Sequence, residues 1–392
     1  MEQQCSTLIV GGGIGGLAAA LATAQHSPDV WVLEQAPQFG EIGAGLQLAP
    51  NALAALDFFG VLDKVYEHAV FPKRLVLRDA YTGDELGALD LGDKFKARYQ
   101  YPYIVTHRSD LHFALLEACR EKENIHLCTN KRVIKVEPLS DEVIVTCEDG
   151  SVYRAKAVIG ADGLWSQTRK LLSDDKPICS EYVAYRGTIP MAEMKADIHE
   201  DDVVMYIGPH MHFVQYPVRR KELFNQVAVF RSFRYKENSD DWGTPEELDE
   251  VFSKCAPHVR HAAGYMNRGR RWPMYDREPI DNWTIGRLTL LGDAAHPMLQ
   301  YMAQGACQAL EDAAYLAVQL KNEQDVEKAF QAYQKERIPR TARVQRSVRL
   351  WGDFLHTDDQ VTAILRSRVL KSRNSDDYTD VDWLYGYRGW LD

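Results

Sequence analysis

The run Thr7-Leu8-Ile9-Val10-Gly11-Gly12-Gly13-Ile14-Gly15-Gly16 decides the fold of this chain. Its first four residues are apolar or β-forming, as expected of a buried parallel strand. The glycines that follow fit the pattern G-x-G-x-x-G, and residues 17–22 are leucines and alanines, which favour a helix. A strand, a glycine-rich turn and a helix in this order are typical of a Rossmann-like α/β domain that binds a dinucleotide.

The glycines of this turn have separate physical roles. Gly11 permits the tight turn, Gly13 lets a pyrophosphate approach the backbone, and Gly16 lets the helix pack closely on the strand. A second apolar strand at 30–33 ends at Glu34, which is placed to accept hydrogen bonds from the hydroxyls of a ribose. The N–H groups at the start of the helix favour phosphate. The further contacts expected of this dinucleotide cradle are Ile14, Gly15 and Gln35.

Composition excludes several classes of function. The 392 residues have a formal net charge of −10, whereas a nucleic-acid-binding domain is normally basic. The seven cysteines form no CxxC pair and no metal-ligand cluster with histidine, so we expect reduced thiols and no metal. No run approaches the roughly 20 apolar residues of a transmembrane helix, and the N-terminus lacks the features of a signal peptide. We therefore expect a cytoplasmic protein with no nucleic-acid partner and no transmembrane segment.

The pattern changes twice along the chain. Short apolar strands with βα spacing extend to residue 176, and residues 177–285 show the longer polar–apolar alternation of an antiparallel sheet. A βα pattern resumes at 288–291, and beyond Gly305 the chain is mostly helical to about residue 372. We predict a discontinuous cofactor domain with an inserted sheet domain that faces the substrate. The predicted cofactor domain comprises 1–70, 100–176 and 286–350, the sheet domain 71–99 and 177–285, and a helical and aromatic C-terminal tail 351–392.

Two further motifs accompany the glycine-rich turn. They are Gly160-Ala161-Asp162-Gly163 and Leu291-Gly292-Asp293-Ala294-Ala295-His296-Pro297. In this order, the three motifs resemble those of the single-component flavoprotein aromatic hydroxylases, the group A monooxygenases that fold like 4-hydroxybenzoate hydroxylase. The resemblance covers nearly the whole chain. It implies an FAD-binding domain with an inserted, mostly antiparallel substrate domain, NADH or NADPH as a transient cosubstrate, and O₂ as a substrate.

The resemblance also implies contacts with the flavin. Asp162 and Gly163 would help to position FAD and the passing nicotinamide, Asp293 would hold the ribityl chain, and Pro297 would lie beside the isoalloxazine. Arg108, in its His-Arg-Ser-Asp-Leu setting, would reach the region between ribityl chain and pyrophosphate. The turn before the helix that follows residue 304 would direct backbone N–H groups at the flavin pyrimidine. The remaining expected cofactor contacts are Gly305, Ala306, Gly45, Gln47 and Val136.

Within the family, several segments resemble the 3-hydroxybenzoate 6-hydroxylases and the related salicylate hydroxylases. They are 43–47, 206–209, 212–217, 272–279 and 378–387. This resemblance implies conversion of a small aromatic acid, 3-hydroxybenzoate, to gentisate. The reduced flavin would activate O₂ as a C4a-hydroperoxide, which attacks an electron-rich ring. The phenol must then lose its proton near neutral pH, and histidine is the side chain suited to this task.

His212 and Tyr216 lie on one predicted strand with the same parity, so they point to one face about 13 Å apart. By resemblance, His212 is the catalytic base and Tyr216 orients the substrate. Gln300 would reach the substrate hydroxyl from the flavin side, and Tyr103 is a further pocket candidate. The sequence does not identify the basic group that would pair with the substrate carboxylate.

Other readings remain open at the level of sequence. A salicylate 1-monooxygenase that releases CO₂, or a hydroxynicotinate or hydroxyquinoline hydroxylase, would differ only in the shape of the pocket. A non-catalytic binding protein on the same fold would have lost its flavin contacts, whereas Arg108, Asp162, Asp293 and Gly305 are all present. A homodimer is compatible with the sequence.

Overall fold

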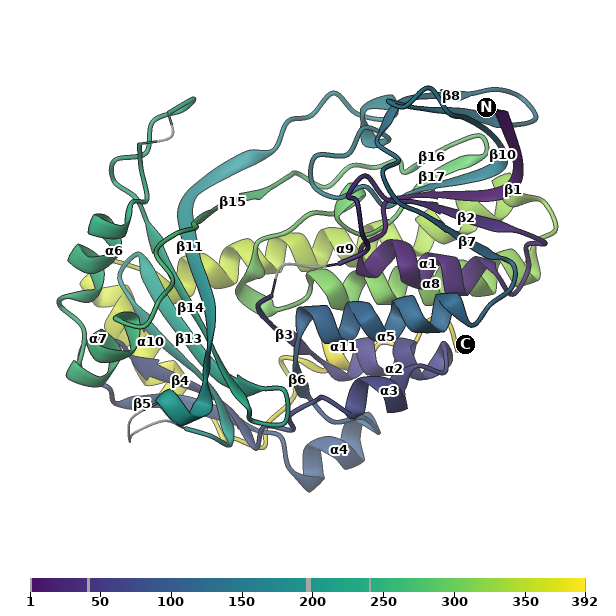
Figure 1. Ribbon diagram of the computed structural model, residues 1–392. Helices are drawn as coiled ribbons and strands as arrows, with labels where there is room; N and C mark the ends of the chain where they lie inside the picture. Colours follow the sequence, from purple (N-terminus) through teal and green to yellow (C-terminus); the bar gives the residue numbers. More distant parts are fainter. Residues whose placement is uncertain (1, 41–42, 195–198, 240, 392) are drawn as a thin grey trace.

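The computed structural model describes residues 2–40, 43–194, 199–239 and 241–391. Two large sheets stand on opposite sides of the molecule, and helices connect them (Figure 1). Within the described residues, no helix is both long enough and apolar enough to cross a membrane.

The first sheet contains the glycine-rich motif. Its strands run in the order β16-β17-β10-β1-β2-β7, and β9 pairs with β10 and with β8. The pairs from β17 to β7 are parallel. Helices α1, α5 and α8 pack together below this sheet (Figure 1). The strands are β1 (Glu2–Val10), β2 (Val30–Leu33), β7 (Ile125–Cys128), β8 (Val133–Pro138), β9 (Val143–Cys147), β10 (Val152–Gly160), β16 (Thr284–Ile285) and β17 (Leu288–Leu290).

The second sheet has the order β15-β11-β14-β13-β12-β4-β5. Its pairs are antiparallel except for β12 and β4, so the expected mostly antiparallel sheet is confirmed. Two of its strands come from early in the chain. The strands are β4 (Arg74–Asp79), β5 (Glu85–Asp90), β11 (Ile178–Pro190), β12 (Asp202–Gly208), β13 (Met211–Val218), β14 (Leu223–Arg231) and β15 (Trp272–Asp276), and a separate pair is β3 (Gly45–Leu48) with β6 (Ile104–His107).

The two faces of the second sheet differ in their neighbours. Tyr185, Phe213 and Phe230 alternate to the outer face, where they form an apolar cluster with residues of α6 and α7 such as Phe252. The residues between them, such as His212, point inward to a cavity. The polar–apolar alternation of these strands thus separates a packed face from a binding face.

A long helix links the two halves of the molecule. Helix α9 (Val326–Leu355) contacts β16 and β17 of the first sheet, and its end reaches the region of the second sheet (Figure 1). It runs through the expected boundary at residue 350, and the division into domains stays a prediction.

The other helices are α1 (Ile14–Thr23), α2 (Pro50–Phe58), α3 (Leu62–Tyr66), α4 (Asp93–Tyr99), α5 (Arg108–Arg120), α6 (Pro245–Phe252), α7 (Pro257–Ala263), α8 (Gly305–Asn322), α10 (Gln360–Ser372) and α11 (Asp382–Tyr385). The short 3₁₀ turns are η1 (Arg169–Leu171), η2 (Met191–Glu193), η3 (Gly292–Ala294) and η4 (Gln300–Met302).

Candidate active site

A cavity of about 1240 Å³ extends from the glycine-rich turn to the inner face of the second sheet. Pockets for small molecules are typically about 300–1000 Å³, so this cavity has room for a dinucleotide together with a small substrate. Most of the predicted site residues line it: Gly11, Gly13, Ile14, Gly15, Glu34, Gln35, Gly45, Gln47, Tyr103, Arg108, Asp162, Gly163, His212, Tyr216, Asp293, Gln300, Gly305 and Ala306.

The glycine-rich turn leaves no space for side chains. Gly11 has a φ of 109°, and a Cβ there would lie 2.3 Å from the carbonyl oxygen of Ala161. A Cβ on Gly16 would lie 1.9 Å from the carbonyl oxygen of Gly11. Gly16 therefore acts in packing rather than in lining. Helix α1 begins just after Gly13, and no described side chain caps it, so its N–H groups are free for an anionic ligand in the cavity.

Two acidic residues shape the cavity wall by holding nearby backbone. Glu34 Oε2 accepts from the N–H of Gly12 at 2.9 Å, which fixes the carboxylate beside the turn. Asp162 accepts from the hydroxyls of Ser166 at 2.5 Å and Thr168 at 2.6 Å. The Asp162 carboxylate thus closes its own loop and holds Gly163, which has a φ of +74°, at the cavity.

The opposite end of the cavity has a second helix N-terminus. Helix α8 begins at Gly305, and no described side chain caps it. Asp293 lies close by, because a Cβ on Gly305 would be 3.9 Å from Asp293 Oδ1. Two uncapped helix starts at one elongated cavity fit FAD, whose pyrophosphate suits α1 and whose electron-accepting pyrimidine suits α8.

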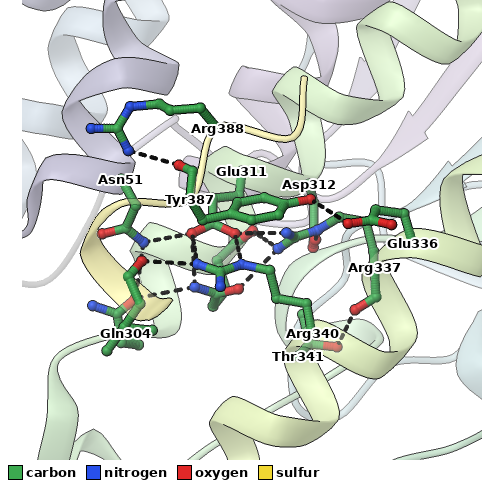
Figure 2. A network of polar contacts seen from close by, with 12 residues as sticks. Asn51, Gln304, Glu311, Asp312, Glu336, Arg337, Arg340, Thr341, Tyr387 and Arg388 are labelled. Atoms are coloured by element: carbon green, nitrogen blue, oxygen red, sulfur yellow. Dashed lines mark hydrogen bonds and ion pairs between the residues drawn. The ribbon is translucent and has the colours of Figure 1, made fainter. Parts of the chain in front are cut away.

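Buried charges hold the α8 end in place (Figure 2). Asp312 accepts from the N–H of Gly292 at 3.0 Å and lies 2.5 Å from His296 Nε2. Arg337 joins Asp312 at 2.7 Å to Glu311 at 2.6 Å. Burial opposes ionisation of Asp312, but His296 and Arg337 outweigh it and lower its pKa to about 2. The network therefore anchors the turn that carries Asp293, and it uses His296 as a structural partner.

Residues 383–387 of the aromatic C-terminal tail pack against this network. Arg340 pairs with Glu311 at 2.6 Å, lies 3.9 Å from the ring centroid of Tyr387, and donates to the carbonyls of Trp383 and Leu384. Figure 2 shows Tyr387 above the paired arginines, with its hydroxyl bonded to Glu336 at 3.1 Å. The C-terminal segment thus contacts the first turns of α8, at the end of the cavity where the flavin pyrimidine is expected.

Arg186 is a half-buried cation in the cavity that the sequence did not single out. Strand pairing places it in one cross-strand row with Val227 and Val214, all of which line the cavity. Its Nη2 donates to Gln300, and its Nε has no hydrogen-bond partner among the described residues. Burial, with a smaller contribution from Arg108, lowers the pKa of Arg186. A guanidinium that is partly removed from water and has an unused N–H donor favours an anionic ligand.

The signal for Arg186 was present in the alternation of β11. An arginine there shares a face with Ala184, which is buried, and a charged residue on such a face indicates a ligand or an ion pair. The sequence did not reveal which strands flank β11, so it could not place Arg186 opposite Gln300.

The other predicted substrate residues line the same cavity as Arg186. Tyr103 donates to Gln47 at 2.8 Å, and Gln47 also bonds to Tyr216. Burial raises the pKa of both tyrosines, so they stay protonated hydrogen-bond donors. Gln300 accepts from Arg186, which leaves its amide group as the donor that it can offer to a substrate.

His212 has a partner that the sequence did not indicate. Its Nδ1 lies 2.7 Å from Nε2 of His356, and the two rings are nearly coplanar, with centroids 4.9 Å apart and an angle of 2° between the ring planes. Burial first, and His356 second, lower the pKa of His212 well below its usual range. His212 is therefore neutral at physiological pH.

Besides Gly16, two predicted cofactor contacts do not belong to the described cavity wall. Val136 pairs with Val145 across the β8–β9 hairpin. Its side chain packs in an apolar cluster with Val145 and Tyr153. Pro297 lies behind the wall, where its carbonyl accepts from Gln345 at 3.0 Å. Their contact with FAD stays a prediction.

The chain belongs to the family described as FAD binding domain, which matches residues 4–348. The 3-hydroxybenzoate 6-hydroxylase of Polaromonas naphthalenivorans (strain CJ2) is 39% identical over 382 residues, covering 97% of this chain and 95% of that protein. The 3-hydroxybenzoate 6-hydroxylase of Klebsiella oxytoca is 38% identical over 390 residues, covering 99% and 98%. The predicted family, the α/β fold class and the FAD cofactor are confirmed.

A solved structure shares the fold. Klebsiella pneumoniae HpxO complexed with FAD and uric acid has a TM-score of 0.83 at 24% identity, covering 94% of this chain and 93% of that chain.

Proposed function

We propose that this chain is an FAD-dependent hydroxylase that converts 3-hydroxybenzoate to gentisate with NAD(P)H and O₂. The observation that carries the proposal is the similarity to 3-hydroxybenzoate 6-hydroxylases along almost the entire chain. The cavity supports it, because it combines a dinucleotide cradle with a histidine and a half-buried arginine at its far end.

The residues of the second sheet have distinct roles in this proposal. Arg186 binds the substrate carboxylate, and Tyr216 donates a hydrogen bond at the same end of the cavity. His212 accepts the phenol proton at Nε2, which makes the ring electron-rich at the carbon opposite the oxygen. Gln300 donates its amide to the substrate. When bound, FAD supplies the electrophilic oxygen.

The site also protects this chemistry from water. Val214 and Val227 line the inner face between the polar residues, and Tyr103 is buried at the edge. An apolar wall of this kind strengthens the Arg186–carboxylate contact, since a lower local dielectric increases electrostatic attraction. The seven free cysteines suit a reducing compartment, and we place the enzyme in the cytoplasm.

Product analysis tests the proposal. The FAD-loaded protein is supplied with NADH, NADPH and O₂, and with 3-hydroxybenzoate, salicylate or 6-hydroxynicotinate in separate reactions. We expect substrate-dependent oxidation of the nicotinamide and one gentisate per 3-hydroxybenzoate. Catechol and CO₂ from salicylate would support the decarboxylating alternative, and hydroxylation of 6-hydroxynicotinate alone would support a pyridine hydroxylase. Hydrogen peroxide without gentisate would contradict the proposed substrate, and a protein that cannot be loaded with FAD would indicate a non-catalytic role.

A further inference from the structure

A second histidine stands behind the expected base. His356, just after the end of α9, is 3% exposed and meets His212 edge to edge through one short hydrogen bond. His212 lines the cavity, so the pair connects the cavity to the interior on the side of α9 and α10. The proposed reaction does not by itself require this second ring.

The hydrogen bond is compatible with the tautomer of His212 that a base needs. To accept a phenol proton, His212 must have a lone pair on Nε2, and therefore a hydrogen on Nδ1. That hydrogen points to Nε2 of His356, which must then be the acceptor and have its own hydrogen on Nδ1. The coplanar rings and the N···N distance of 2.7 Å require one hydrogen between Nδ1 of His212 and Nε2 of His356, and a phenol at Nε2 of His212 selects the arrangement in which His212 is the donor.

The groups around the pair do not stabilise a cation. Tyr182 stacks on His356 at 5.1 Å, and Tyr301 contacts both histidines edge-on. Arg366 from α10 and His210 both lower the pKa of His356, after burial as the largest cause, to about 3. A proton that arrives at His212 therefore has no stable resting place within the pair.

Polar groups near the protein surface lie next to His356. The backbone N–H of His210 donates to the carbonyl of His356 at 2.9 Å, and the ring of His210 bonds to Asp358 at 2.9 Å. The carboxyl side chain of Asp358 is 68% exposed. The other acidic groups whose charges act on the flanking tyrosines are Asp353, Glu181 and Asp276. The surroundings of the pair thus change from the closed cavity to the protein surface over a short distance.

We propose that His356 is a positioning residue that fixes the tautomer of His212 and passes the substrate proton outward. The phenol O–H bond breaks and its proton bonds to Nε2 of His212. The Nδ1 proton of His212 bonds to Nε2 of His356, and the Nδ1 proton of His356 leaves to water near Asp358. One proton leaves the substrate, one reaches the solvent, and both histidines end neutral. The inference rests on the proposed hydroxylation of a phenol.

Two variants separate this role from a structural one. His356→Gln retains an acceptor for the Nδ1–H of His212 but cannot pass a proton on, and His356→Phe retains the stacked ring without an acceptor. Tyr182→Phe is the matched control, because it keeps the ring against His356 and removes only a hydroxyl. Each FAD-loaded protein is mixed with 3-hydroxybenzoate, and phenolate formation is followed by ultraviolet absorbance from pH 6 to pH 9, beside KM and the yield of gentisate.

We expect both His356 variants to form phenolate at least about tenfold more slowly than the wild type at pH 6.5. The difference should shrink toward pH 9, where hydroxide can ionise the phenol, and KM should stay within about threefold. Tyr182→Phe should match the wild type. A His356→Gln protein as fast as the wild type would overturn the relay, as would a loss that is equal at every pH.

Two further outcomes keep the test decisive. If the variants do not retain FAD, the rate of phenolate formation in wild-type protein is measured in mixtures of H₂O and D₂O. A curved dependence on the deuterium fraction supports the movement of more than one proton, and a straight line overturns the relay. If the wild type hydroxylates another phenol but not 3-hydroxybenzoate, the proposed substrate is wrong, and the same comparison is made with that phenol.

Discussion

Arg186 in β11 donates a hydrogen bond to Gln300 in η4. This contact joins the second sheet to the segment that follows the Gly292–Asp293 turn. The two residues are 114 positions apart in the chain. This contact holds a cation at the base of the cavity, in the row that also contains Val214 and Val227.

Replacement of Arg186 by glutamine should weaken binding of an anionic substrate. A hydrogen bond to a charged group contributes about 1.5–3 kcal/mol, so we expect KM for 3-hydroxybenzoate to rise about ten- to hundredfold. The neutral analogue 3-hydroxybenzamide is the control, and its dissociation constant should change little. An equal loss for both ligands, measured by flavin absorbance titration, would show that Arg186 acts on the fold of the pocket instead.

Replacement of His212 by alanine should preserve FAD binding but slow hydroxylation, most strongly at low pH. The phenol is protonated there and needs a base, whereas at high pH it ionises without one. The measurement is gentisate formed per NADH oxidised from pH 6 to pH 9. Turnover that equals the wild type at every pH would remove His212 from the reaction.

Acid should destabilise the native protein through the buried histidine pair. The pKa of His356 is lowered from 6.5 to about 3, so between these values the unfolded chain binds a proton that the folded chain does not. The contribution of His356 to stability is present above pH 6.5 and is lost as the pH falls, on the order of 2 kcal/mol at pH 5. The drop in urea midpoint from pH 7.5 to pH 5 should be smaller in His356→Phe. Equal drops in both proteins would contradict this assignment.

Replacement of Gly16 by alanine should abolish FAD binding. Its methyl group would lie 1.9 Å from the carbonyl oxygen of Gly11, so the turn and α1 must separate. Gly40→Ala is the control, since no atom of the described residues lies within 4 Å of its added methyl group. Flavin absorbance after purification and reconstitution distinguishes the two, and a yellow Gly16→Ala protein would refute the packing argument.

Replacement of Arg337 by methionine should destabilise the protein by about 3–5 kcal/mol. The change leaves the buried carboxylates of Glu311 and Asp312 with too little compensating charge. Arg154→Met, which removes a more exposed ion pair with Glu142, should cost less than about 1 kcal/mol. Urea unfolding of both holoenzymes makes the comparison, and similar losses would argue against a special role for the network.

Local patterns predicted the cofactor end of the molecule well. The strand, turn and helix at 7–22 lie next to one another in the chain, so neighbouring residues determine both their conformation and the closeness of their packing. The same holds for the parity of His212 and Tyr216, which follows from the twofold repeat of a strand. Val136 was assigned by resemblance alone, and strand pairing places it in an apolar cluster.

The sequence by itself determined the nature of the dinucleotide cradle, because its glycines are required by contacts within one short segment. Only the tertiary structure decided what stands opposite the flavin. Arg186 meets Gln300 across the cavity, and His356 meets His212 over 144 positions of the chain. Such pairs depend on which strands lie side by side and on where α9 ends. No local spacing encodes these relations, because they arise from the packing of the whole chain.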